Sequence, residues 1–154
     1  MLGTVATLTS STTYAGLGDL PHFNPDDDRD PLHPAVAELR AAIKTADAVL
    51  ICTPEYAGGL PGSFKNLLDW TVGGGEIYGK PVAWINASSV AAPTGGRDAH
   101  DSLRKVLTYA GAKIVEEACV RLPVSRAVVA DGEVTDPDLR GRIAVAVQRL
   151  REGV

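Results

Sequence analysis

Two short loops in this sequence carry residues suited to holding a flat ligand. The first loop, residues 53–59, directly follows the apolar run 48–52. Its two glycines accept backbone conformations that other residues avoid, and they let a planar molecule lie directly against the main chain. The loop contains Pro54, Glu55, Tyr56, Ala57 and Gly58.

The second loop, residues 88–97, follows the apolar run 81–87 and leads into a helical pattern. Backbone N–H groups at the start of a helix suit electronegative groups of a ligand. The Arg97 side chain either adds positive charge there or is simply solvated. The candidate binding residues of this loop are Ser88, Gly95, Gly96 and Arg97.

The strands and helices predicted on either side of the two loops indicate where the loops lie relative to each other. Residues 48–52 and 81–88 are short runs rich in Val, Ile and Ala, as expected of strands covered on both faces. Apolar residues at helical spacing follow each loop, in 61–72 and 99–110. Parallel strands alternating with helices place both loops at one edge of the sheet, where open α/β sheets bind ligands. The predicted fold is therefore α/β, a three-layer sandwich with a mostly parallel sheet.

The remaining segments predict further elements of such a domain. A helix is expected at 36–46, a polar edge strand at 113–121, an Asp-Gly hairpin at 128–134 and a closing helix through 139–150. A strand is also expected at 12–16. The acidic run 26–28 lies in a proline-rich loop, and its carboxylates are expected to be solvated, because they lack the spacing of a calcium loop.

Composition excludes several classes of partner. The net charge is -4 and the pI about 5.3, so we expect no nucleic-acid partner. The sequence shows neither a run of 18 apolar residues nor a basic N-terminal region, so we expect a cytoplasmic protein without a membrane partner. Cys52 and Cys119 fall in predicted strands, and the three histidines are scattered, so no metal site is expected. The length predicts one domain, residues 1–154.

Residues 74–80 satisfy the pattern GxxxxGK that begins a phosphate-binding P-loop. Pro81 stands where the P-loop needs Ser or Thr, and the segment precedes a strand where a P-loop must follow one. A nucleoside triphosphatase is therefore excluded.

The pattern TPEYxxxxPGxxKNxxDW, residues 53–70, resembles the signature of the NADPH-dependent FMN reductase family. These flavodoxin-like proteins include quinone, azo-dye and chromate reductases. Ser88 and Gly95 to Arg97 align with the family's Ser-Pro-Gly…Gly-Gly-x-Arg region, although Ser89 and Val90 replace Pro-Gly. The resemblance implies FMN held with its isoalloxazine ring beside Pro54, Glu55, Tyr56 and Gly58. At position 57 the family commonly has Asn, so only the main chain of Ala57 is expected to contribute.

The resemblance implies an FMN-dependent NAD(P)H oxidoreductase that passes electrons to flavin, quinone or another small acceptor. The chemistry belongs to the cofactor, so no catalytic acid–base pair is expected. A homodimer or homotetramer through the helix 61–70 is implied. Two alternatives remain open: a non-enzymatic flavodoxin-like module with weak or no FMN binding, and an electron carrier that does not react with NAD(P)H.

The resemblance also implies a unit that the sequence does not show. A flavodoxin-like chain opens with a strand, a phosphate-holding loop and a helix, together about 30 residues. Residues 12–16 align with the family's second strand, and residues 1–10 with the tail of its first helix. We expect either that the natural reading frame starts upstream or that FMN binding is weakened and 12–16 or 1–10 pairs with 48–52. The first option is favoured because unpaired buried amides are costly.

Overall fold

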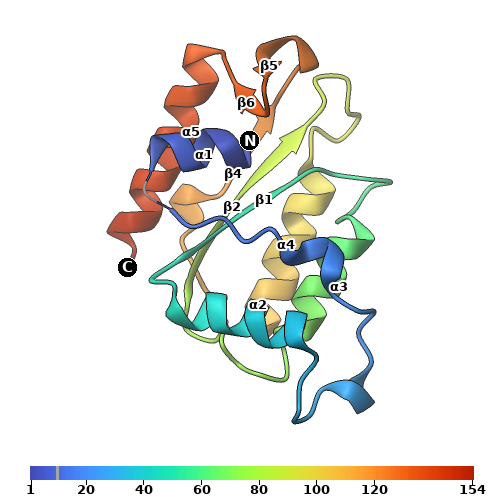
Figure 1. Ribbon diagram of the computed structural model, residues 1–154. Helices are drawn as coiled ribbons and strands as arrows, with labels where there is room; N and C mark the ends of the chain where they lie inside the picture. The colour runs from blue at the N-terminus through green and yellow to red at the C-terminus, as the bar shows by residue number, and fades with distance from the viewer. Residues whose placement is uncertain (10) are drawn as a thin grey trace.

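A parallel β-sheet with helices on both faces forms the molecule (Figure 1). The computed structural model describes residues 1–9 and 11–154. The α-helices are α1 (Leu2–Leu8), α2 (Pro34–Thr45), α3 (Gly62–Trp70), α4 (Arg97–Tyr109) and α5 (Pro137–Glu152). The strands are β1 (Val49–Thr53), β2 (Pro81–Ser88), β3 (Lys113–Ile114), β4 (Val120–Pro123), β5 (Val129–Ala130) and β6 (Glu133–Val134). Within the described residues, no helix is long and apolar enough to cross a membrane.

Strand β2 is the centre of the sheet. It pairs in parallel with β1 on one side, from Val49 opposite Val82 to Thr53 opposite Asn86. On its other side it pairs in parallel with β3 and then with β4. The carboxyl ends of β1, β2 and β4 therefore lie at one edge of the sheet. This arrangement confirms the predicted α/β sandwich and its parallel sheet.

The two faces of β2 build two separate cores, because successive side chains of a strand point to opposite faces. Val82 and Trp84 face α2, α3 and α4, and are fully buried with Leu103 and Leu107. Ile85 faces α1 and α5 and packs with residues that include Ile143. Helices α1 and α5 thus form one outer layer, and α2, α3 and α4 form the other (Figure 1).

Helix α3 forms hydrogen bonds with the segment 21–23, which lies more than forty residues earlier in the chain. The Asn66 amide donates to the Pro21 carbonyl at 2.9 Å and accepts from the Phe23 N–H at 2.7 Å. The Trp70 indole N–H also donates to the Pro21 carbonyl, at 2.9 Å. Asn66 and Trp70, both part of the sequence signature, therefore fix a loop of the fold rather than line the ligand edge. The Lys65–Asp69 pair of the same helix is partly exposed.

The strand predicted at residues 12–16 is wrong. These residues enter a 3₁₀ turn, η1 (Gly16–Asp19), and Tyr14 packs against the core cluster of α2 and α3. No backbone hydrogen bond joins residues 11–15 to β1, so the predicted closure of the sheet is absent from this segment. Residues 2–8 are helical, and Ser10 lies outside the described residues. Strand propensity of Thr and Tyr depends on a pairing partner, and here Tyr14 packs against the core cluster of α2 and α3 instead.

The single strand predicted at 113–121 is interrupted. A 3₁₀ turn, η3 (Glu116–Ala118), separates β3 from β4, and Cys119 lies in the connection rather than in a strand. The turn lets Glu116 reach Arg104 of α4 while Ala118 is buried against Leu150 of α5. The predicted hairpin is confirmed: β5 and β6 pair in antiparallel around Asp131 and Gly132, both at positive φ.

The acidic run was expected to be solvated, and this holds for Asp26 and Asp27 alone. The Asp28 carboxylate lies 2.6 Å from the guanidinium of Arg40, and both side chains are about nine-tenths buried. Arg40 also donates two hydrogen bonds to the Trp70 carbonyl at the end of α3. Asp28 is therefore part of an internal ion pair that joins α2, α3 and the proline-rich loop.

Candidate functional site

The first loop leaves β1 as a tight turn. The N–H and C=O groups of Tyr56 and Gly59 bond each other at 3.0 and 3.1 Å. The two residues between them, Ala57 and Gly58, have φ of 51° and 72°. Two consecutive positive φ values are typical of a type I′ turn, for which Asn-Gly is the preferred sequence. The turn leaves the Tyr56 side chain 65% exposed at the sheet edge.

Glu55 joins the two loops. Its carboxylate accepts a hydrogen bond from the Thr94 hydroxyl and another, at 2.9 Å, from the N–H of Ala99 in the first turn of α4. The first backbone N–H groups of a helix have no partner within the helix, and a carboxylate satisfies them well. Glu55, which lies in the loop after β1, therefore caps the amino end of α4.

Opposing effects act on the Glu55 carboxyl group. Burial disfavours its charged form, but the hydrogen bonds from Thr94 and from the α4 backbone outweigh burial, and the pKa of Glu55 is lowered. Because the pKa of Glu55 is lower in the folded state than in the unfolded state, where it is about 4.3, the ionised carboxylate stabilises the fold at pH values above 4.3. This stabilisation is lost as the pH falls through the folded-state pKa.

Glu55→Gln is expected to lower the free energy of unfolding at neutral pH by about 1–2 kcal/mol. The amide carries no negative charge, so its hydrogen bonds to the Ala99 N–H and the Thr94 hydroxyl are weaker and the favourable interaction with the amino end of α4 is lost. Urea unfolding between neutral and acidic pH measures the effect. The variant should differ most from the wild type near neutrality and converge with it at low pH. Glu117→Gln, an exposed carboxylate, is the control. A constant difference between Glu55→Gln and the wild type down to the lowest pH would contradict the assignment.

Asn86, Ser88 and Gly96 meet beneath the second loop. Asn86 is fully buried and Ser88 is 5% exposed. Neither the Asn86 amide nor the Ser88 hydroxyl has a hydrogen-bond partner within the described residues. Gly96, at φ 79°, approaches so closely that a Cβ there would lie 1.9 Å from the Asn86 Oδ1. Buried polar groups are nearly always hydrogen-bonded, so this cluster has unused capacity for a ligand or a water molecule.

The remaining predicted residues lie around this junction. Pro54 is half-buried at the end of β1, while Ala57 and Gly58 are exposed in the turn. Gly58 lies near α4, since a Cβ there would be 3.8 Å from the Asp98 carboxylate. Arg97 is exposed and lies 3.6 Å from Asp98. The structure thus brings the loops together through Glu55 but leaves Arg97 at the surface.

His100, Cys52 and Cys119 lie in environments that favour their uncharged forms. The Trp84 indole donates to His100 Nδ1 at 2.8 Å. Burial, with Arg104 and Arg121 nearby, lowers the pKa of His100, so the ring is neutral at neutral pH. Burial raises the pKa of Cys52 and of Cys119 to about 11. Both thiols are protonated at neutral pH and are poor nucleophiles.

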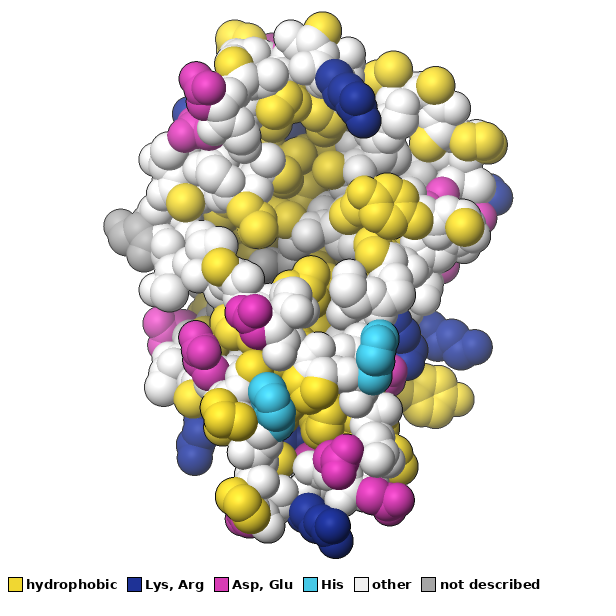
Figure 2. Space-filling model, turned by 45° about the vertical axis from the view of Figure 1, so that its right-hand side comes forward, with side chains coloured by type: hydrophobic (Ala, Val, Ile, Leu, Met, Phe, Trp, Pro, Cys, Tyr) yellow, Lys and Arg dark blue, Asp and Glu magenta, His cyan; other side chains and the backbone are white. Residues whose placement is uncertain are grey.

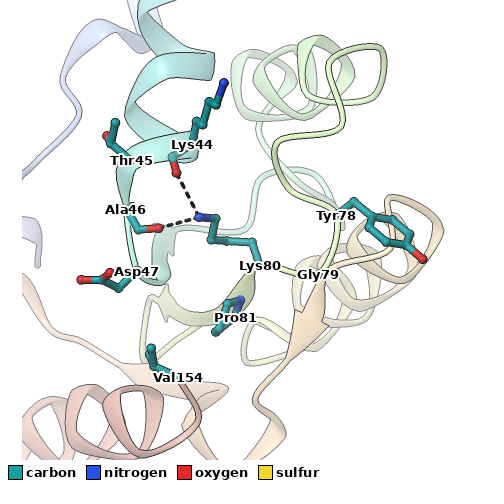
Figure 3. Close-up of a pocket in the computed structure, with 9 residues that line it drawn as sticks. All are labelled: Lys44, Thr45, Ala46, Asp47, Tyr78, Gly79, Lys80, Pro81 and Val154. Atoms are coloured by element: carbon teal, nitrogen blue, oxygen red, sulfur yellow. Dashed lines mark hydrogen bonds between the residues drawn. The ribbon is translucent and has the colours of Figure 1, made fainter.

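A cavity at the opposite end of the sheet has a different character. Figure 3 shows it between the end of α2 and the start of β2, with Lys80 pointing inward. The Lys80 ammonium donates to the carbonyl oxygens of Lys44 and Ala46, at 3.3 and 2.5 Å. It neutralises the negative end of α2. The Lys80 ammonium is thus bound to the carbonyl end of α2 and not to a phosphate, which agrees with excluding a P-loop at 74–80.

Comparison with known proteins identifies the family. The sequence matches the family described as NADPH-dependent FMN reductase over residues 2–125. The chain belongs to the NADPH-dependent FMN reductase family. Members are oxidoreductases whose cofactors are FMN and NAD(P)H.

Two curated relatives cover most of the chain. A 2-hydroxy-1,4-benzoquinone reductase of a Burkholderia species is 34% identical over 145 residues, which are 90% of this chain and 76% of that protein. An NAD(P)H-dependent FMN reductase of Pseudomonas aeruginosa is 31% identical over 144 residues, 92% of this chain and 77% of that protein.

A solved structure supports the fold. The flavoenzyme NAD(P)H:(acceptor) oxidoreductase FerB of Paracoccus denitrificans superposes with a TM-score of 0.82 at 29% identity. The alignment covers 99% of this chain and 88% of FerB. The flavodoxin-like sandwich predicted from the sequence is confirmed.

The junction of the two loops fits the ring of FMN. Glycines at positive φ leave open backbone on both loops, and the buried polar atoms of Asn86 and Ser88 lie unpaired beneath one of them. Hydrophobic side chains are also exposed in a hollow on one face of the molecule (Figure 2). Apolar walls with a few polar groups are typical of cofactor sites.

Sequence reasoning missed three residues of this junction: Asn86, Thr94 and Ala99. Asn86 could have been noticed, because it is the one amide in the apolar run 81–87. Thr94 and the Ala99 N–H carry no comparable signal, since their role depends on a carboxylate 39 and 44 residues earlier in the chain.

Proposed function

We propose that this chain is an FMN-dependent NAD(P)H oxidoreductase that reduces a quinone or another small acceptor. The observation that carries the proposal is the Glu55 bridge, which holds two glycine-containing loops together at the carboxyl edge of the sheet. The chemistry supplied by bound FMN is the transfer of two electrons from the hydride of NAD(P)H to the acceptor.

The chain's own residues would bind and orient the ring. The backbone of residues 54–58 would lie beside it, and the backbone of Gly95 and Gly96 would approach it from the second loop. The names of the relatives, a benzoquinone reductase and an FMN reductase, support a small aromatic acceptor.

The decisive experiment uses two readouts on the same protein. FMN fluorescence is titrated with the chain, and NAD(P)H is then added under anaerobic conditions. We expect quenching followed by bleaching of the flavin absorbance, and quinone-dependent oxidation of NAD(P)H. No quenching would indicate a module that does not bind FMN, and quenching without bleaching would indicate an electron carrier.

We also propose that the protein is a homodimer or homotetramer in the cytoplasm. Exposed hydrophobic side chains at the ends of α3 and α4, Val72 and Tyr109, support association. Light scattering tests the assembly, and a monomer mass at every concentration would contradict it.

A further inference from the structure

A second cavity lies at the same edge of the sheet as the two loops. Its volume is about 490 Å³, it is open to solvent, and it is lined by the second loop, strand β4 with the preceding Cys119, and one side chain of α5. Its polar lining residues include Ser88, Arg121 and Arg142. Val90 and Pro123 give it apolar walls. The cavity therefore adjoins the proposed ring site and could receive the part of a substrate that extends beyond the ring.

The two arginines of this cavity carry positive charge that is not neutralised. Arg121 and Arg142 form no ion pair with a carboxylate within the described residues, whereas Arg40, Arg97, Arg104 and Arg140 do. The Arg142 guanidinium donates to the Arg121 carbonyl at 3.2 Å, and the Arg121 guanidinium lies 3.5 Å from the Thr94 carbonyl. Neutral carbonyls hold both side chains in place while leaving their charge available. Among the residues that the structure describes, none that lines the cavity is acidic.

The inner end of the cavity has polar atoms that lack partners. The Ser88 hydroxyl is buried and makes no hydrogen bond within the described part of the chain. Asn86 lies directly opposite Arg121 in the β2–β4 ladder, behind the cavity lining, and its side-chain amide also has no hydrogen-bond partner within the described residues. An oxyanion would accept hydrogen bonds from a hydroxyl and from guanidinium groups together.

We propose that Arg121 and Arg142, with Ser88, form an anion-binding subsite for an acidic group carried by a redox substrate. This proposal rests on the proposed function, because it adds a recognition element to the same edge. The shared chemistry is a sulfonate, carboxylate or phosphate oxyanion attached to an aromatic or nucleotide body. Two redox substrates contain such a group. One is a quinone acceptor with an acidic substituent, and the other is NADPH, whose ribose phosphate distinguishes it from NADH.

The test compares the double variant R121Q/R142Q with the wild type. Arg126→Gln is the matched control, since Arg126 is exposed and lies outside the cavity. Steady-state kinetics are measured with a naphthoquinone sulfonate, with unsubstituted naphthoquinone, and with NADPH and NADH. We expect the double variant to lower kcat/KM for the sulfonate at least tenfold and to change kcat/KM for the neutral quinone by less than twofold. Added salt should weaken the wild-type preference for the sulfonate, because the cavity is open to solvent.

The outcomes separate the two sources of the anion. A loss confined to the sulfonate supports the subsite and assigns it to the acceptor. A loss confined to NADPH, with NADH unaffected, supports the subsite and assigns it to the electron donor. Equal effects of R121Q/R142Q and Arg126→Gln on all four substrates would overturn the proposal.

Equilibrium dialysis with the same naphthoquinone sulfonate separates this proposal from the function itself. If the wild type binds no FMN and reduces no quinone, the proposed function fails. Retention of the sulfonate by the wild type but not by R121Q/R142Q would still support the subsite. Equal retention by both proteins would overturn the subsite.

Discussion

Arg40→Met is expected to lower the free energy of unfolding by about 3–5 kcal/mol, the typical cost of removing one partner from a buried ion pair. The guanidinium lies 2.6 Å from the Asp28 carboxylate and donates twice to the Trp70 carbonyl. Both side chains of the pair are about nine-tenths buried, and Glu76 lies 3.8 Å away. Methionine keeps an unbranched apolar stem but lacks the guanidinium, so it would leave the Asp28 charge and a helix-end carbonyl without a donor.

Urea unfolding measures this loss, with two matched controls. Arg29→Met removes an exposed arginine next to Asp28 and should change stability by less than about 0.5 kcal/mol. The double variant R40M/D28N removes the unpaired charge as well and should recover part of the loss. A change below about 1 kcal/mol in Arg40→Met would show that the ion pair adds little.

Gly96→Ala is expected to have the largest effect on the site. Its φ of 79° disfavours any side chain, and the new Cβ would lie 1.9 Å from the Asn86 Oδ1 and 3.3 Å from the Ser88 Cβ. Asn86 is fully buried, so it cannot move aside. The backbone strain and the overpacking together predict a loss of about 2–4 kcal/mol in stability. Displacement of the loop should also weaken FMN binding at least tenfold, which corresponds to about 1.4 kcal/mol.

Gly95→Ala separates strain from contact. Gly95 also has a positive φ, 59°, but a Cβ there would meet no atom within 4 Å. It should therefore show only the backbone cost of about 1–2 kcal/mol. The double variant G96A/N86A removes the contact and should recover stability relative to Gly96→Ala. Equal stability of Gly95→Ala and Gly96→Ala would refute the role of the Asn86 contact.

The strands β1 and β2, the loops after them and the family could be predicted from the sequence. Apolar runs of the right length, together with the TPEY pattern, specify these elements locally. The interruption at residues 116–118 could not be predicted, because it depends on Arg104 and α5 reaching opposite faces of one segment. The absent strand at 12–16 is similar: α3, rather than a neighbouring strand, holds the chain that follows it.

The candidate site was predicted as two facing loops, and the structure shows what joins them. Glu55 was expected beside the ring, yet its carboxylate caps α4. Ala57 was expected to contribute its main chain, and its φ of 51° adds that it occupies a conformation better suited to Asn or Gly. Sequence patterns identify residue types at a sheet edge, but they do not show which donors and acceptors pair across it.

Strand β1 has one edge that faces away from β2. In a parallel ladder, alternate residues point their N–H and C=O groups to that outer side, and no backbone hydrogen bond from residues 1–9 or 11–154 reaches it. Such a row is a template on which another extended chain can add itself. These outward amide hydrogens should exchange with deuterium in the solvent much sooner than those of β2, which is paired on both sides. Solvent therefore reaches the backbone of the sheet first at β1.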